Sequence, residues 1–122
     1  MGVESSYGLK FGYMDHGPRN LITDVPGVRV GHVTIHDGEV HTGVTAIIPH
    51  TGDVFHEKCL AGAHVINGFG KSIGLVQVQE LGTLESPILL TNTLSVGTVS
   101  TALVEYMLER NDDIGLDAGT VN

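Results

Sequence analysis

Apolar and polar residues alternate over residues 28–35, which predicts a β-strand. Val28 and Val30 share one face of that strand, whereas Val33 and Ile35 fall on the opposite parity. A β-bulge at Gly31-His32 would bring all four side chains to a common face, so we expect a bulge there.

A second strand is predicted over residues 44–48, because these residues are mostly apolar or β-branched and Pro49 follows them directly. The polar residues 36–42 predict a hairpin-like connection between the two strands. Residues 54–65 show no clear period, and both a strand and an irregular segment remain open for them.

Glycine-rich residues 67–70 predict a loop that needs permissive backbone angles. A short helix is predicted over residues 72–81. Ser72 is a suitable residue to cap its start, and Gly82 is a suitable residue to follow its end.

Residues 88–90 are wholly apolar, which is typical of a buried strand. The clearest helix is predicted over residues 96–110, where apolar residues recur at three-and-four spacing after Ser95, a preferred N-cap residue. Asn111-Asp112-Asp113 ends this helix.

Residues 119–122 resemble the start of another strand, and no helix stop or cap accompanies them. We therefore expect residues 1–122 to be the N-terminal portion of a single domain, truncated at its C-terminal end.

The composition is that of a folded domain, with 41% hydrophobic and 16% charged residues. The formal net charge is −8, and the six Lys and Arg residues are scattered along the chain. Nucleic acid and anionic membranes bind through clustered Lys and Arg, so neither is an expected partner. Residues 86–104 carry no charge, but they are too polar and interrupted to span a membrane.

The single Cys59 cannot form a disulfide within the chain, which favours a reducing compartment. Residues 1–10 lack the apolar stretch of a signal peptide. Both features predict a cytoplasmic protein.

Seven histidines raise the question of a metal site. His56-Glu57 begins a His-Glu-x-x-His pattern, but Leu60 occupies the position of its second histidine. His36 and His41 flank the predicted loop without carboxylates at a recognised spacing. We therefore expect no metal ion and no other cofactor.

Two further chemical patterns are incomplete. Cys59 has no glycine-rich elbow or helix start beside it, so a buried structural cysteine is favoured over a nucleophile, although His56 and His64 are near in sequence. Residues 68–72 end like a phosphate-binding loop, but Val65 occupies the position of its first glycine. A turn that brings polar groups to the rim of a cleft is the alternative for this segment.

The turn at residues 91–97 is the candidate binding feature, because a strand leads into it and a helix leaves it. Free N–H groups and the positive end of a helix favour carboxylate or oxyanion groups. We expect Asn92, Thr93 and Ser95 to line a substrate cleft, together with Asn67. A serine cap with satisfied turn residues is the alternative interpretation.

An ordered series of sequence blocks gives the chain a family resemblance. It resembles the DmpA-type L-aminopeptidase/D-esterase-amidase family from Asn20 to Asn122 in the blocks 21–32, 42–47, 61–62, 67–68, 80–82, 85, 87–88, 91–97 and 119–122. Several blocks in one order are far more specific than any single block.

The resemblance implies the α/β class, with this chain as part of an αββα sandwich of the kind shared with ornithine acetyltransferases. It also implies a precursor that cuts itself before a Ser or Thr, whose α-amine can then serve as the base for its own hydroxyl. Members release N-terminal residues from peptides, amides or esters, and they are typically homo-oligomers, often tetramers.

The nucleophile and its supporting residues lie later in the family pattern than this chain extends, so no catalytic residue is carried over to it. We expect an N-terminal fragment of a serine aminopeptidase or amidase, inactive alone, with the remainder of the enzyme as a second chain. An acyltransferase of the ornithine acetyltransferase type is one alternative, although residues 92–97 argue against it. A non-catalytic oligomerising domain is the other.

Overall fold

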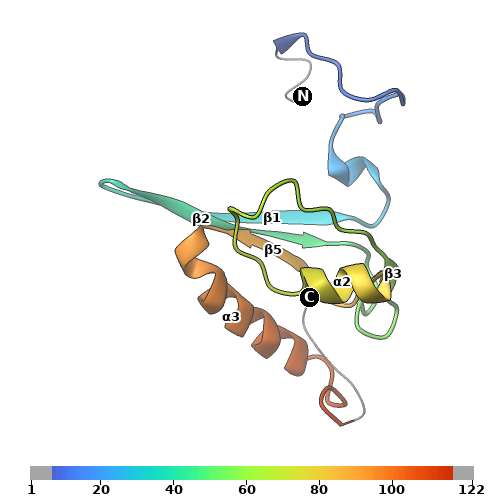
Figure 1. The fold of residues 1–122 in the computed structure, drawn as a ribbon, viewed down its shortest axis with the longest axis vertical. Helices are drawn as coiled ribbons and strands as arrows, with labels where there is room; N and C mark the ends of the chain where they lie inside the picture. Colours follow the sequence, from blue (N-terminus) through green and yellow to red (C-terminus); the bar gives the residue numbers. More distant parts are fainter. Residues whose placement is uncertain (1–6, 117–122) are drawn as a thin grey trace.

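The computed structural model describes residues 7–116. Its central feature is a three-stranded antiparallel sheet with the strand order β1-β2-β5 (Figure 1). β1 spans Arg29–Asp37, β2 spans Val40–Ile48 and β5 spans Ile88–Thr91. Only Gly38 and Glu39 separate β1 from β2, and Gly38 has a φ of 56°, which favours glycine.

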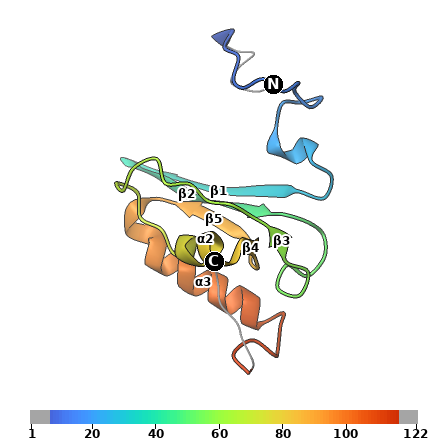
Figure 2. The same ribbon diagram turned by 45° about the vertical axis from the view of Figure 1, so that its right-hand side comes forward.

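One helix covers one face of this sheet (Figures 1 and 2). This helix, α3, contributes Leu103 and Met107 to a small core with Phe55, and Leu89 of β5 packs against that core. The other elements are short: η1 Ile22–Asp24, β3 Cys59–Leu60, α2 Leu75–Leu81, β4 Thr83–Leu84 and η2 Thr93–Ser95, followed by α3 Val96–Leu108. β3 and β4 form a separate two-stranded sheet.

The predicted β-bulge is wrong. β1 and β2 pair residue for residue from Arg29 opposite Ile48 to Asp37 opposite Val40. Val33 and Ile35 therefore stay on the face opposite to Val30, and Val33 is 68% exposed. The bulge was predicted on the premise that the apolar side chains share one buried face. At this end of the hairpin, however, the apolar side chains of Val33 and Ile35 are exposed.

The polar connection predicted over residues 36–42 is also shorter than expected. Glycine in the two-residue turn allows the strands to continue to it, and His36 and His41 become paired strand residues. Residues 54–65 are largely irregular and contain only the two residues of β3 as strand.

Both predicted helices form with changed starts or ends. α2 begins at Leu75 after Gly74, whose φ is 88°, and not at Ser72, whereas Gly82 closes the helix as predicted through its N–H bond to the Val78 carbonyl. α3 ends at Leu108. The predicted loop at residues 67–70 forms, but neither of its glycines adopts a positive φ. Residues 119–122 lie outside the described residues.

β5 is less buried than its apolar sequence predicts, because only one of its faces packs against the core beside α3. Within residues 7–116 no strand pairs with its outer edge. Leu90 is 53% exposed on the face opposite to Leu89. No helix in the described part of the chain is long and apolar enough to cross a membrane.

We expect the isolated 122-residue chain to self-associate, because an open strand edge and exposed apolar side chains both favour pairing with another chain. Leu90→Lys should weaken this association by placing a charge on the exposed face of β5. Ile66→Lys is the matched control, since Ile66 is 90% exposed in a loop. Sedimentation velocity over a range of concentrations measures the effect, and a wild-type chain that stays monomeric throughout contradicts it.

Candidate functional site

The side chain of Asn92 holds together the turn between β5 and α3. Its Oδ1 atom accepts hydrogen bonds from the N–H groups of Leu94 and Ser95, at 3.0 and 3.1 Å. Its Nδ2 atom donates to Thr42 Oγ1 at 2.7 Å and to Ser95 Oγ at 3.0 Å. One amide group therefore caps the start of the helical segment and ties it to β2.

Asn92, and not Ser95, is the N-terminal cap. The side chain of Ser95 makes no capping hydrogen bond to α3. The reason is the 3₁₀ turn η2, which directly precedes α3, so that the helical segment begins at Thr93 and not at Val96. Asn is among the preferred N-cap residues, so Asn92 was itself a suitable cap in the sequence, three positions before the predicted cap Ser95.

The capping also changes the expected chemistry of the turn. The N–H groups of Leu94 and Ser95 are already bonded to Asn92, so they are not free to bind an anion. The polar side chains remain near the surface, with Asn92 and Thr93 exposed and Ser95 half-buried.

The four predicted cleft residues lie in two places. Asn92 and Ser95 are hydrogen-bonded to each other, and Thr93 lies between them. Asn67 lies in the loop at residues 67–70, where its Oδ1 atom accepts a hydrogen bond from the N–H of Phe69 at 3.1 Å. That all four line one substrate cleft stays a prediction.

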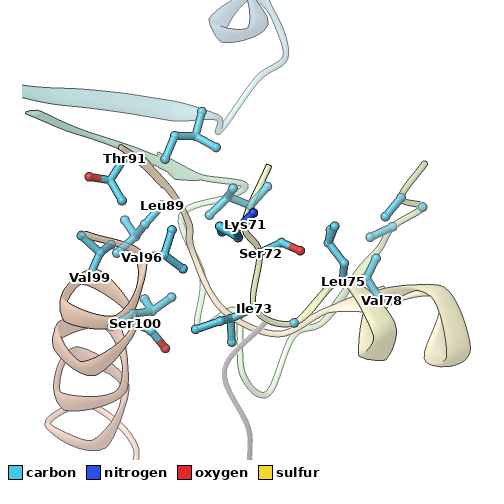
Figure 3. A pocket seen from close by; sticks show the side chains of 17 residues that line it. Lys71, Ser72, Ile73, Leu75, Val78, Leu89, Thr91, Val96, Val99 and Ser100 are labelled. Atoms are coloured by element: carbon cyan, nitrogen blue, oxygen red, sulfur yellow. The ribbon is translucent and has the colours of Figure 1, made fainter. Parts of the chain in front are cut away.

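An apolar hollow of about 430 Å³ adjoins the turn (Figure 3). Thr91 and Val96, which flank the turn, both line it. Val99 and Leu103 of α3 form one wall, and residues 71–75 form another. Such a hollow fits a small apolar side chain or an apolar segment of protein.

The turn at residues 68–72, for which the sequence offers the rim of a cleft as an alternative, supplies part of the polar lining of this hollow. That lining comes from Lys71, Ser72 and Ser100, in addition to Thr91. Lys71 Nζ donates to the Phe69 carbonyl at 3.1 Å, so its amine is held near the rim by its own loop.

His56 is not available as a base for Cys59. Its Nδ1 atom lies 2.6 Å from Asp53 Oδ2, and its Nε2 atom lies 2.9 Å from Asp113 Oδ2. Both ring nitrogens are therefore engaged, in an arrangement that joins the loop after β2 to the turn after α3. Cys59 is half-buried in β3.

The bonds to His56 perturb all three groups. The hydrogen bonds to Asp53 and Asp113 raise the pKa of His56 above the ordinary 6.5. The hydrogen bond from His56 lowers the pKa of Asp53 and that of Asp113 below the ordinary 3.8. The imidazolium is the form that donates from both nitrogens, so the triad acts as a charged structural link. No group of three or more His, Cys, Asp or Glu side chains in the described residues is arranged to hold a metal ion.

Known proteins give this site its context. Peptidase family S58 matches residues 20–122, and the chain belongs to this family. The resemblance drawn from the ordered sequence blocks is therefore confirmed.

Two curated relatives are β-peptidyl aminopeptidases named BapA. The one from Sphingosinicella microcystinivorans is 38% identical over 102 residues, which cover 76% of this chain and 26% of the relative. The one from Sphingosinicella xenopeptidilytica is 39% identical over 99 residues, which cover 74% of this chain and 24% of the relative. The chain thus spans about a quarter of the length of these relatives.

Three solved structures share the fold. The PH0078 protein from Pyrococcus horikoshii OT3 is 52% identical with a TM-score of 0.87, over 98% of this chain and 36% of that one. A β-aminopeptidase from Burkholderia sp. is 46% identical with a TM-score of 0.73, over 86% of this chain and 31% of that one.

The third structure is the L-aminopeptidase D-Ala-esterase/amidase from Ochrobactrum anthropi. It is 34% identical with a TM-score of 0.71, over 87% of this chain and 31% of that one. It is described as a prototype of the serine aminopeptidases and a variant of the Ntn hydrolase fold. The likeness confirms the predicted α/β class, with the chain as part of the αββα sandwich.

Replacing Asn92 should destabilise the protein more than replacing Ser95. Asn92→Ala removes the cap and the tie to β2, and we expect it to lower the free energy of unfolding by about 1–2 kcal/mol. Ser95→Ala should cost less, about 0.5 kcal/mol, because it removes only one of the four hydrogen bonds of the Asn92 side chain. Urea unfolding of the complete protein measures both, and a larger loss for Ser95→Ala would restore serine as the cap.

The link at His56 should weaken as the pH rises. A raised pKa in the folded state means that the stabilisation is fully present below about pH 6.5 and is lost as the pH passes the folded value. The carboxylates act in the opposite sense, since their contribution is lost as the pH falls through their lowered values.

We therefore expect His56→Gln to lower the melting temperature at about pH 5.5 and to have little effect at about pH 8.5. His64→Gln is the control, because His64 is an exposed histidine that belongs to neither this link nor the turn. An equal loss at both pH values would show that protonation of His56 is irrelevant to stability.

Proposed function

We propose that this chain is the N-terminal part of a self-processing serine aminopeptidase that releases N-terminal residues from peptides, amides or esters. The observation that carries the proposal is the match of Peptidase family S58 to residues 20–122. The likeness in fold to an enzyme described as a prototype of the serine aminopeptidases supports it. The nucleophile is supplied by the remainder of the enzyme.

The turn at Asn92 lines the substrate cleft in this proposal. Asn92 and Thr93 are exposed on a turn that is fixed by β5 on one side and α3 on the other. Polar groups held between two rigid elements can orient a substrate. The apolar hollow beside the turn receives the rest of the enzyme or the substrate side chain, and Asn67 lies on the second loop of the cleft.

The remainder of the enzyme is the proposed partner, present as a second chain after self-cleavage. The exposed Leu90 and the open edge of β5 give it a surface to cover. The assembled enzyme is a cytoplasmic homo-oligomer, a tetramer in the leading proposal, that acts on small peptides or amino-acid amides and esters. The β-peptidyl aminopeptidases among its relatives make substrates with an N-terminal β-residue the first to assay.

The two alternatives are less well supported. An acyltransferase of the ornithine acetyltransferase type would share the fold, but the characterised relatives are named as aminopeptidases. A non-catalytic oligomerising domain would not explain a match to a peptidase family over most of the chain.

Asn92→Asp tests the role of this turn without removing the cap. A carboxylate keeps the acceptor for the N–H groups of Leu94 and Ser95, and a negative charge is favourable at a helix start. It loses the donor that reaches Thr42 and Ser95. In the complete processed enzyme we expect kcat/KM for an aminoacyl amide to fall at least ~10-fold, with little change in melting temperature.

Thr42→Val is the matched control, because it removes one partner of the Asn92 amide and leaves the amide itself in place. If Asn92 contacts the substrate, Thr42→Val should retain more activity than Asn92→Asp. Equal losses would assign Asn92 to the scaffold. The 122-residue chain alone should hydrolyse nothing, and a turnover that Cys59→Ala abolishes would instead point to the thiol.

A further inference from the structure

The end of the β1–β2 hairpin holds two histidines face to face. His36 and His41 are directly opposite in the strand register, one pair before the turn. Their Nδ1 atoms are 2.7 Å apart, and the ring centroids are 4.9 Å apart with planes inclined at 60°. Both residues are exposed. The sequence pattern placed them on a loop, and strand pairing brings them together.

A hydrogen bond between two neutral imidazoles uses one proton and one lone pair. The lone pair of one Nδ1 atom therefore already points at the other Nδ1 atom. When both rings carry their proton on Nε2, the two Nδ1 lone pairs converge on the same space. Lone pairs that point at each other repel, and rotation of the two exposed rings directs both of them at one ion beside the line that joins the nitrogens.

The chemistry of the two ligands indicates the kind of ion. Two nitrogens bound about 2.0 Å from a metal and at right angles lie about 2.8 Å apart, whereas a tetrahedral ion separates them by about 3.3 Å. The observed 2.7 Å is a hydrogen-bond distance, and from it both nitrogens reach one ion with only a small movement of the rings. Tetragonal coordination by imidazole is characteristic of Cu²⁺ and Ni²⁺, and Cu²⁺ has the higher affinity of the two.

The surroundings suit an exposed cation. A shallow hollow of about 390 Å³ borders the pair, with His32, Gly43 and Thr45 also in its lining. His32 is held by a 2.9 Å contact from its Nδ1 atom to Thr45 Oγ1. Residues 36–41 contain two carboxylates and no Lys or Arg, in a chain of net charge −8, so the field attracts a dication.

We propose that His36 and His41 chelate one Cu²⁺ ion through their Nδ1 atoms, with water completing the coordination plane. Each imidazole then carries its proton on Nε2, so the proton that joined the two Nδ1 atoms moves to the far nitrogen of its own ring. Neither the ion nor the protein changes oxidation state. The site is independent of the proposed peptidase chemistry, and it clamps the two strands at the exposed end of the hairpin.

The test is a Cu²⁺ titration of the purified protein, free of any histidine tag, followed by electron paramagnetic resonance. We expect one equivalent to bind with a Kd of about 1 μM or lower and with hyperfine structure from two imidazole nitrogens. His36→Gln and His41→Gln should each weaken binding at least ~10-fold and leave a single nitrogen. His64→Gln, at an exposed histidine outside the hairpin, should bind as the wild type does.

Two results would overturn the proposal. One is wild-type affinity in His36→Gln or an equal loss in His64→Gln, since either would assign the binding to other groups. The other is a wild-type spectrum without two equivalent imidazole nitrogens, which requires no variant and so does not depend on whether the variants fold. Ni²⁺ should also bind more tightly than Zn²⁺, and the reverse order would exclude the right-angled geometry.

Discussion

The pairing of β5 with β2 is the interaction on which the rest of the structure depends. Four residue pairs, from Val44 opposite Thr91 to Ile47 opposite Ile88, make up the whole of it. With that register, Leu89 faces the core that α3 helps to form, and Asn92, which follows β5, reaches Thr42 of β2. The Thr91 hydroxyl adds a bond to the Gly43 carbonyl. On the other side of β2, a side chain at position 43 would collide with the Val33 carbonyl oxygen of β1, so the close approach of these two strands requires glycine.

Sequence patterns predicted the element types well where a single local signal decides them. The apolar run at β5, the spacing of apolar residues in α3 and the glycine after α2 each depend on neighbours within a few positions, and the structure confirms all three. Peptidase family membership was recoverable for a different reason, because it is carried by many blocks in a fixed order and not by any one of them.

The errors arose where tertiary context decides. The bulge in β1 was predicted on the assumption of a buried face, which the end of the hairpin does not have. The polar residues around its turn predicted a loop, but strands on an exposed sheet can also be polar, and these residues are paired. The cap at Asn92 was missed because a 3₁₀ turn before α3 cannot be distinguished from a loop by apolar spacing. The hollow beside it combines residues from four separate segments, which no local pattern brings together.

The hydrogen bond between Asn92 and Thr42 joins residues that are 50 positions apart in the chain. The hairpin closes through a two-residue turn and can form early, since its contacts are local. The cap of α3 reaches its second partner only after β5 has docked on β2, so the first turn of this helix is completed late in folding. This corner of the molecule should accordingly open first under mild denaturation, and its amide protons should exchange before those of the hairpin.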